Sequence, residues 1–174
     1  VVGGVPAGYL AERFGTPLVG YCAETLQARA RALRAVGAAH VAFGTKALPN
    51  VAALRLLREE GIGADVASTG ELAFARAAGF SGHELVVHGN NKDTALLTQA
   101  AHDGAAVVLD ASDEAELAAA AGVRRALVRI TLGVDADTHE AVVTGHHGSK
   151  FGLPPEQALA VLGDALERGL EVLG

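Results

Sequence analysis

Short apolar runs alternate with longer alanine-rich stretches along almost the whole chain. The apolar runs occupy residues 17–21, 40–44, 63–68, 84–89, 105–110, 125–133 and 169–174. They are continuous rather than alternating, which is typical of strands that are buried on both faces of a parallel sheet. The stretches between them, residues 23–37, 49–61, 69–80, 92–104 and 112–122, have the length and composition of helices. The pattern therefore predicts an α/β fold.

Local signals place the ends of several of these helices. Most of the helical stretches end on glycine, the residue that commonly follows a helix. Pro49 suits the first turn of the second helix, and Ser68 and Glu71 have the spacing of a capping box. After residue 39 the strands recur about every 20 residues, the repeat of a compact βα unit.

Two folds have this repeat, an open doubly wound sheet and a (β/α)₈ barrel. The open sheet usually carries a glycine-rich phosphate turn after its first strand, and no such turn follows any predicted strand here. A barrel places polar residues where its strands end. Five successive strands end near an ionisable residue: Lys46, Asp65, His88, Asp110 and Arg129. This ring of ionisable residues favours a site at the mouth of a barrel.

The number of predicted strands is too small for a closed barrel, which requires eight. Five lie between residues 39 and 133, and residues 169–174 resemble the start of a sixth. We therefore expect a partial (β/α)₈ barrel of about five to six βα units. The chain begins at Val1 and contains no methionine, so we also expect that it is part of a longer polypeptide.

Composition excludes several classes of protein. The chain has 174 residues and a formal net charge of −6, with no basic patch for nucleic acid or an anionic membrane. It has one cysteine, Cys22, which excludes an internal disulfide and favours the reducing cytoplasm. No apolar run approaches the ~18 residues of a membrane span. Three histidines, His139, His146 and His147, lack the regular spacing of metal ligands, so no metal is expected.

Lys46 is the first candidate for chemistry. It follows an apolar strand, and in a mostly apolar setting its pKa would be lowered, which favours reaction with a carbonyl group. The alternative is an ordinary surface lysine near the start of the next helix.

Three stretches resemble a known family: "AFGTKALPNVAALRLLREEGIGADVASTGELAFARAAGF", "VVHGNNK" and "LVRITLGVDADTHEAVVTGHHGSKFGL". They are similar, in order and approximate spacing, to the N-terminal barrel of diaminopimelate decarboxylases. These are pyridoxal-phosphate enzymes of the alanine-racemase-like fold. The resemblance extends from "LAERFGTP" to the end of the chain, and "HGNNK" and the series "VDADTHE…TG…SKFG" are more discriminating than the lysine motif.

The resemblance implies a role for each matching residue. Lys46 matches the lysine that binds the cofactor aldehyde. Asp65 and Glu71 match acidic residues that flank this lysine and the cofactor, and His88 and Asn90 match the turn beneath the cofactor.

Two further basic residues match the family. Arg129 matches an arginine near the pyridine ring, and Lys150 matches a lysine that pairs across a dimer interface. Structural alternatives remain open for several positions. Glu71 can be only a capping-box acid, His88 a strand-end histidine, and Arg129 the partner of a buried carboxylate. Asp110 fits a helix-entry or barrel-mouth carboxylate rather than a catalytic one.

For the parent enzyme, the resemblance implies decarboxylation of meso-diaminopimelate to L-lysine, with pyridoxal 5'-phosphate as cofactor, in a homodimer. The alternatives are a related decarboxylase of ornithine, arginine or D-amino acids, and an inactive truncated remnant. Residues 1–22 are expected to form a segment whose strand packs on a further β-domain, and residues 23–174 an incomplete cofactor-binding barrel. We expect this chain alone to be inactive.

The sequence departs from the family pattern beside the lysine. Phe43 and Gly44 occupy the places of a usual Tyr-Ala pair, and Leu48-Pro49 interrupts the expected Lys-Ala-Asn. "HHGSKFG" also lacks the acidic residue that is common before the Ser-Lys pair. These departures loosen the assignment of substrate but leave Lys46 in place.

Overall fold

Six strands form one parallel sheet in the computed structural model, which describes residues 1–132 and 151–174. The strands are β1 (Ala42–Gly44), β2 (Gly63–Val66), β3 (Leu85–Val87), β4 (Ala106–Leu109), β5 (Arg125–Val128) and β6 (Glu171–Val172). They lie in the order β1-β2-β3-β4-β5-β6, and every neighbouring pair is parallel. Each strand therefore lies beside its successor, which is the winding of a barrel and not of a doubly wound sheet. The predicted partial barrel is confirmed.

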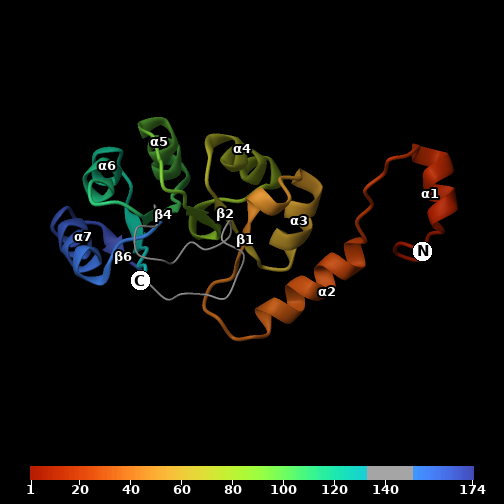
Figure 1. Ribbon diagram of the computed structural model, residues 1–174, viewed down its shortest axis with the longest axis horizontal. Coiled ribbons are helices and arrows are strands. Elements are labelled where there is room, and N and C mark those ends of the chain that lie inside the picture. Colours follow the sequence, from red (N-terminus) through yellow and green to blue (C-terminus); the bar gives the residue numbers. More distant parts are fainter. Residues whose placement is uncertain (133–150) are drawn as a thin grey trace.

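Helices cover the outer face of this sheet. They are α3 (Val51–Glu59), α4 (Thr69–Ala78), α5 (Thr94–Asp103), α6 (Glu114–Ala120) and α7 (Pro155–Glu167). Figure 1 shows them as an arc with the strands on its inner side. Two further helices, α1 (Ala7–Phe14) and α2 (Ala23–Arg34), extend away from the β1 end of the sheet (Figure 1). Short 3₁₀ turns, η1 (Thr45–Ala47) and η2 (Gly82–Glu84), complete the elements.

The core lies between the strands and the helices α3–α7. Its largest fully buried side chains include Leu54, Leu72 and Leu97 from helices, and Val87 and Leu109 from strands. Complete burial of each such side chain contributes about 1.5–3 kcal/mol. The continuous apolar runs are thus explained by strands that are enclosed on the helix side and partly covered on the other.

The helix ends agree with the predicted signals, with one correction. The Ser68 hydroxyl accepts a hydrogen bond from the Glu71 backbone N–H at 3.2 Å, which is the N-cap half of the predicted capping box; the Glu71 carboxylate accepts from the backbone N–H of Ala67 in place of that of Ser68. Gly79 ends α4 in the left-handed conformation, which glycine adopts without steric cost. Pro49 does not lie in the first turn of α3 as predicted. The helix cap is Asn50, whose side chain accepts a backbone hydrogen bond, and it leaves Pro49 just outside the helix.

The strand predicted at residues 17–21 is absent from the structure, so that prediction was wrong. Leu18, Val19 and Tyr21 are exposed, and the segment takes no part in the six-stranded sheet. A strand needs a neighbour that pairs with its backbone groups, and this segment has none within the described part of the chain. Helix α1 also buries no residue. The expected packing of this segment on a further domain stays a prediction.

None of the helices within residues 1–132 and 151–174 combines the length and hydropathy that a membrane span requires.

Candidate active site

A cavity of about 540 Å³ lies at the carboxyl end of the sheet. All six of the predicted site residues line it: Lys46, Asp65, Glu71, His88, Asn90 and Arg129. They come from η1, β2, α4 and the segments that follow β3 and β5. The carboxyl ends of parallel strands meet at one edge of the sheet, so residues far apart in sequence converge there. The predicted mouth site is therefore brought together in one place.

Lys46 lies in η1, directly after β1, and its side chain is exposed. The mostly apolar setting expected for it is not observed, because the cavity lining includes two carboxylates, a histidine and an arginine. The preceding residue, Thr45, is fully buried. Its hydroxyl lies 2.5 Å from Glu71 Oε2 and 3.0 Å from the backbone oxygen of Asp65. Thr45 thus ties the lysine turn to β2 and α4, a role that the sequence did not reveal.

Glu71 lies in the first turn of α4 and lines the cavity. Its carboxylate accepts hydrogen bonds from the Thr45 hydroxyl and from the Ala67 backbone N–H, the latter at 3.1 Å. Its own backbone N–H donates to Ser68. Ser68 thus caps the helix at the Glu71 backbone, while the Glu71 carboxylate ties the lysine turn to the start of α4.

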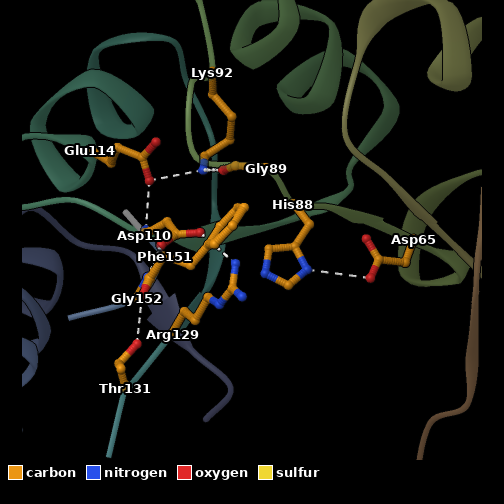
Figure 2. Close-up of polar contacts among 10 residues, drawn as sticks. All are labelled: Asp65, His88, Gly89, Lys92, Asp110, Glu114, Arg129, Thr131, Phe151 and Gly152. Atoms are coloured by element: carbon orange, nitrogen blue, oxygen red, sulfur yellow. Dashed lines mark hydrogen bonds and ion pairs between the residues drawn. The ribbon is translucent and has the colours of Figure 1, made fainter. Parts of the chain in front are cut away.

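Asp65 and His88 form a pair across β2 and β3. His88 Nδ1 lies 3.3 Å from Asp65 Oδ2, as Figure 2 shows. In the neutral tautomer with the proton on Nδ1, Nδ1–H donates a hydrogen bond to the Asp65 carboxylate and Nε2 keeps a lone pair. Nε2 is buried, and among the described residues it has no hydrogen-bond partner. A buried polar atom of this kind calls for a partner beyond the described residues.

Arg129 follows β5 and is held by Asp110, which follows β4. Arg129 Nη1 lies 2.9 Å from Asp110 Oδ2, and the Asp110 side chain is completely buried. The guanidinium carbon lies 4.8 Å from the centre of the Phe151 ring, a cation–π distance. The Gly152 backbone N–H donates to the other Asp110 oxygen (Figure 2). The structural alternative for Arg129 is thus observed, yet the residue also lines the cavity.

A second buried ion pair lies behind the cavity wall, and sequence reasoning missed it. Lys92 Nζ lies 2.8 Å from Glu114 Oε2 and 2.5 Å from the backbone oxygen of Gly89. The Lys92 side chain has no exposed surface. The same Glu114 oxygen accepts the backbone N–H of Asp110 at 2.6 Å. Charged residues near helix starts are normally solvated, so no pattern in the sequence indicates that these two face each other.

Some expectations concern residues outside the described part of the chain. Lys150, His139, His146 and His147 all lie there. Within residues 1–132 and 151–174, no group of three or more histidine, cysteine or acidic side chains is arranged to hold a metal ion.

Comparison with known proteins agrees with this geometry. The sequence model of the family "pyridoxal-dependent decarboxylase, pyridoxal binding domain" matches residues 23–174. A diaminopimelate decarboxylase from Actinosynnema pretiosum is 46% identical over 99% of this chain and 39% of its own length. One from Deinococcus radiodurans is 41% identical over 94% of the chain and 43% of its own length.

The fold comparison gives the same family. The crystal structure of diaminopimelate decarboxylase from M. jannaschii in complex with L-lysine superposes with a TM-score of 0.83 at 30% identity. It covers 98% of this chain, which corresponds to 44% of that protein. The chain thus spans less than half the length of these relatives. It belongs to the pyridoxal-dependent decarboxylase family, and residues 23–174 are its pyridoxal-binding domain.

Proposed function

We propose that this chain forms the cofactor pocket of an enzyme that decarboxylates meso-diaminopimelate to L-lysine. The observation that carries the proposal is the convergence of Lys46 with the other five predicted residues on one cavity. Both curated relatives described above are diaminopimelate decarboxylases, which favours this substrate over ornithine, arginine or a D-amino acid. The activity is proposed for the protein that carries this chain.

The residues present fit pyridoxal 5'-phosphate. An exposed primary amine, Lys46, suits the cofactor aldehyde. Gly44 leaves open space beside that lysine, since a side chain built there would meet no atom within 4 Å. The buried Nε2 of His88 lacks a partner among the described residues, and a polar ring or its substituents can supply one.

Held in this pocket, the cofactor would supply an electron sink for the pair released when the substrate's α-carboxylate leaves as carbon dioxide, once the substrate's amine has taken the place of Lys46 at the aldehyde. The residues of this chain would hold and orient the reacting groups. Lys46 Nζ would bind the aldehyde and afterwards be free to carry a proton to or from the reacting carbon. His88 would present Nε2 to the bound group while Asp65 fixes its ring through Nδ1. Arg129, held by Asp110, would place a positive charge in the cavity wall.

Reductive labelling tests the pocket directly. The purified protein is mixed with pyridoxal 5'-phosphate and reduced with borohydride, and the modified peptide is found by mass spectrometry. We expect the label on Lys46 and its loss in Lys46→Ala. Lys92 is an internal control, because its buried and ion-paired amine should stay unlabelled. Equal labelling of Lys46 and Lys92, or a pattern unchanged by Lys46→Ala, would contradict the proposal.

Release of carbon dioxide tests the substrate. The protein that carries this chain should decarboxylate meso-diaminopimelate with higher kcat/KM than ornithine or arginine, and Lys46→Ala should abolish the reaction. A preference for ornithine or arginine would assign the enzyme to another branch of the family. Absence of activity with every one of these substrates would favour an inactive remnant.

We also propose a cytoplasmic homodimer for the protein that carries this chain. The family resemblance, including Lys150, supports the dimer, and the single cysteine suits a reducing compartment. We further propose that a second domain covers the N-terminal segment, residues 1–22, where Val19 is 75% exposed and α1 buries no residue. Analytical ultracentrifugation of the whole protein should give the mass of two subunits, and a monomer would exclude the dimer.

A further inference from the structure

A chain of four charged side chains connects the helix layer to the cavity. Lys92 contacts Glu114, Glu114 accepts the backbone N–H of Asp110, and Asp110 pairs with Arg129. Figure 2 shows this path from Lys92 at the top of the view to Arg129, which lines the cavity. It contains two cations and two carboxylates, so its formal charges balance.

The Lys92–Glu114 pair is buried deeply enough for the loss of hydration to cost free energy. The Lys92 side chain is not exposed at all, and that of Glu114 is 5% exposed. A buried ion pair is seldom more stabilising than an apolar pair of the same size, because both charges lose their hydration. Stability alone is therefore a weak reason for an ammonium group at this position. The backbone group that the ammonium contacts suggests a stronger reason.

Lys92 holds the backbone of the turn that lines the cavity. Its Nζ donates to the carbonyl oxygen of Gly89, and Gly89, Asn90 and Asn91 all line the cavity. Gly89 has a φ of +95°, and a side chain there would lie 3.2 Å from the backbone oxygen of Ala67. The turn thus requires glycine at position 89 for its backbone conformation, and the Lys92 ammonium fixes the carbonyl group of that glycine.

This contact also sets the direction of a peptide group. The bond between Gly89 and Asn90 is trans, since the one cis bond among the described residues joins Thr16 to Pro17. In a trans peptide the C=O and N–H point in opposite directions. When Lys92 draws the Gly89 carbonyl toward helix α6, the Asn90 N–H is directed away from α6.

We propose that Lys92 is a positioning residue for the pyridoxal-phosphate pocket. Its ammonium fixes the Gly89–Asn90 peptide and, through Glu114 and the Asp110 backbone, ties that turn to the segment that holds Arg129. Two walls of the cavity are thus set by one buried cation. The inference rests on the proposed function, because it assigns Lys92 a purpose in binding that cofactor.

The test separates positioning from stability in the protein that carries this chain. The double variant Lys92→Met/Glu114→Gln removes both charges together, so no unpaired buried charge remains. The amide oxygen introduced at position 114 can still accept the Asp110 N–H, whereas the thioether introduced at position 92 cannot donate to the Gly89 carbonyl. The matched control is Arg76→Met/Asp103→Asn, which removes a 2.6 Å ion pair between α4 and α5 that is outside the cavity lining.

The dissociation constant for pyridoxal 5'-phosphate and the thermal midpoint of the cofactor-free protein are measured for each variant. We expect the Lys92/Glu114 variant to bind about tenfold more weakly or worse, the usual effect of losing a partner that orients a binding group. The Arg76/Asp103 variant should bind the cofactor with wild-type affinity even if its thermal midpoint is lower. Wild-type affinity in the Lys92/Glu114 variant would overturn the inference and leave the proposed function intact.

A single variant tests which of the two charged groups is the anchor, and its free energy of unfolding is measured beside its affinity because Glu114→Gln leaves the buried Lys92 ammonium without a carboxylate. Glu114→Gln retains the Lys92 ammonium on the Gly89 carbonyl, so its affinity should stay close to that of the wild type. An affinity loss in Glu114→Gln beyond its loss of stability would overturn the inference, because the anchor would then be the carboxylate. A wild type that binds no pyridoxal 5'-phosphate would overturn the proposed function and this inference together.

Discussion

Asp110 is the buried carboxylate on which one wall of the cavity depends, so Asp110→Asn should destabilise the protein measurably. One carboxylate oxygen receives the Arg129 guanidinium and the other receives the Gly152 N–H. Asparagine keeps the shape but replaces one oxygen with a donor, so one of the two donors loses its acceptor. A hydrogen bond to a charged group contributes about 1.5–3 kcal/mol, and an unsatisfied buried group costs about 1–3 kcal/mol. Arg129 is 26% exposed, and water can take up part of its loss.

Together these terms give an expected decrease of about 2–4 kcal/mol in the free energy of unfolding. Urea unfolding of the cofactor-free protein, followed by circular dichroism, measures it. Asp113→Asn is the matched control, since Asp113 is exposed and its side chain makes no capping hydrogen bond. That control should change stability by less than about 0.5 kcal/mol. Equal effects of the two substitutions, or a loss below about 1 kcal/mol for Asp110→Asn, would refute the account of this wall.

Three further predictions concern glycine and leucine positions, and a fourth concerns the cysteine. Gly44→Ala meets no atom within 4 Å and has an ordinary φ of −68°, so it should stabilise by about 0.4–1 kcal/mol in urea unfolding. Gly63→Ala would bring a Cβ within 2.7 Å of a backbone carbonyl oxygen, and the same assay should show a loss of about 1–3 kcal/mol. Leu54→Ala removes a fully buried side chain of α3 and should cost about 2.7–5 kcal/mol, again by urea unfolding. Hydrogen bonding to Thr25 lowers the pKa of the Cys22 thiol, which raises the thiolate fraction near neutral pH. Iodoacetamide should therefore modify Cys22 faster at pH 7 than it modifies Cys22 in a Thr25→Val variant.

The parallel sheet and the convergence of the site residues could be predicted from the pattern of apolar runs in the sequence. Continuous apolar runs at a regular spacing specify parallel strands, and parallel strands present their carboxyl ends at one edge. Asp65 and His88 are 23 residues apart, yet each lies at the end of one strand of a neighbouring pair. Their contact is therefore a consequence of the order of the strands, which the repeat of βα units already predicts.

Other features depend on how packed elements face one another, which no spacing encodes. Lys92 and Glu114 each stand at the entry to a helix, and only the packing of α5 beside α6 and the course of the preceding turn bring them together. The polar surroundings of Lys46 likewise depend on side chains that distant segments contribute to the cavity lining. The wrong strand at residues 17–21 has a related cause, because an apolar run becomes a strand only where a neighbour is available to pair with it.

The charges around the cavity distinguish one lysine from every other basic group of the site. Arg129 is paired with Asp110, Lys92 with Glu114, and the His88 ring with Asp65. Lys46 has no ion pair with any described residue, and its side chain is exposed at the cavity. An amine reacts with a carbonyl group only when its lone pair is free, and a carboxylate partner favours the protonated form. Among the described residues, each of these three basic groups is thus paired with a carboxylate, and Lys46, the amine proposed to bind the cofactor aldehyde, is the basic group of the site without an ion pair.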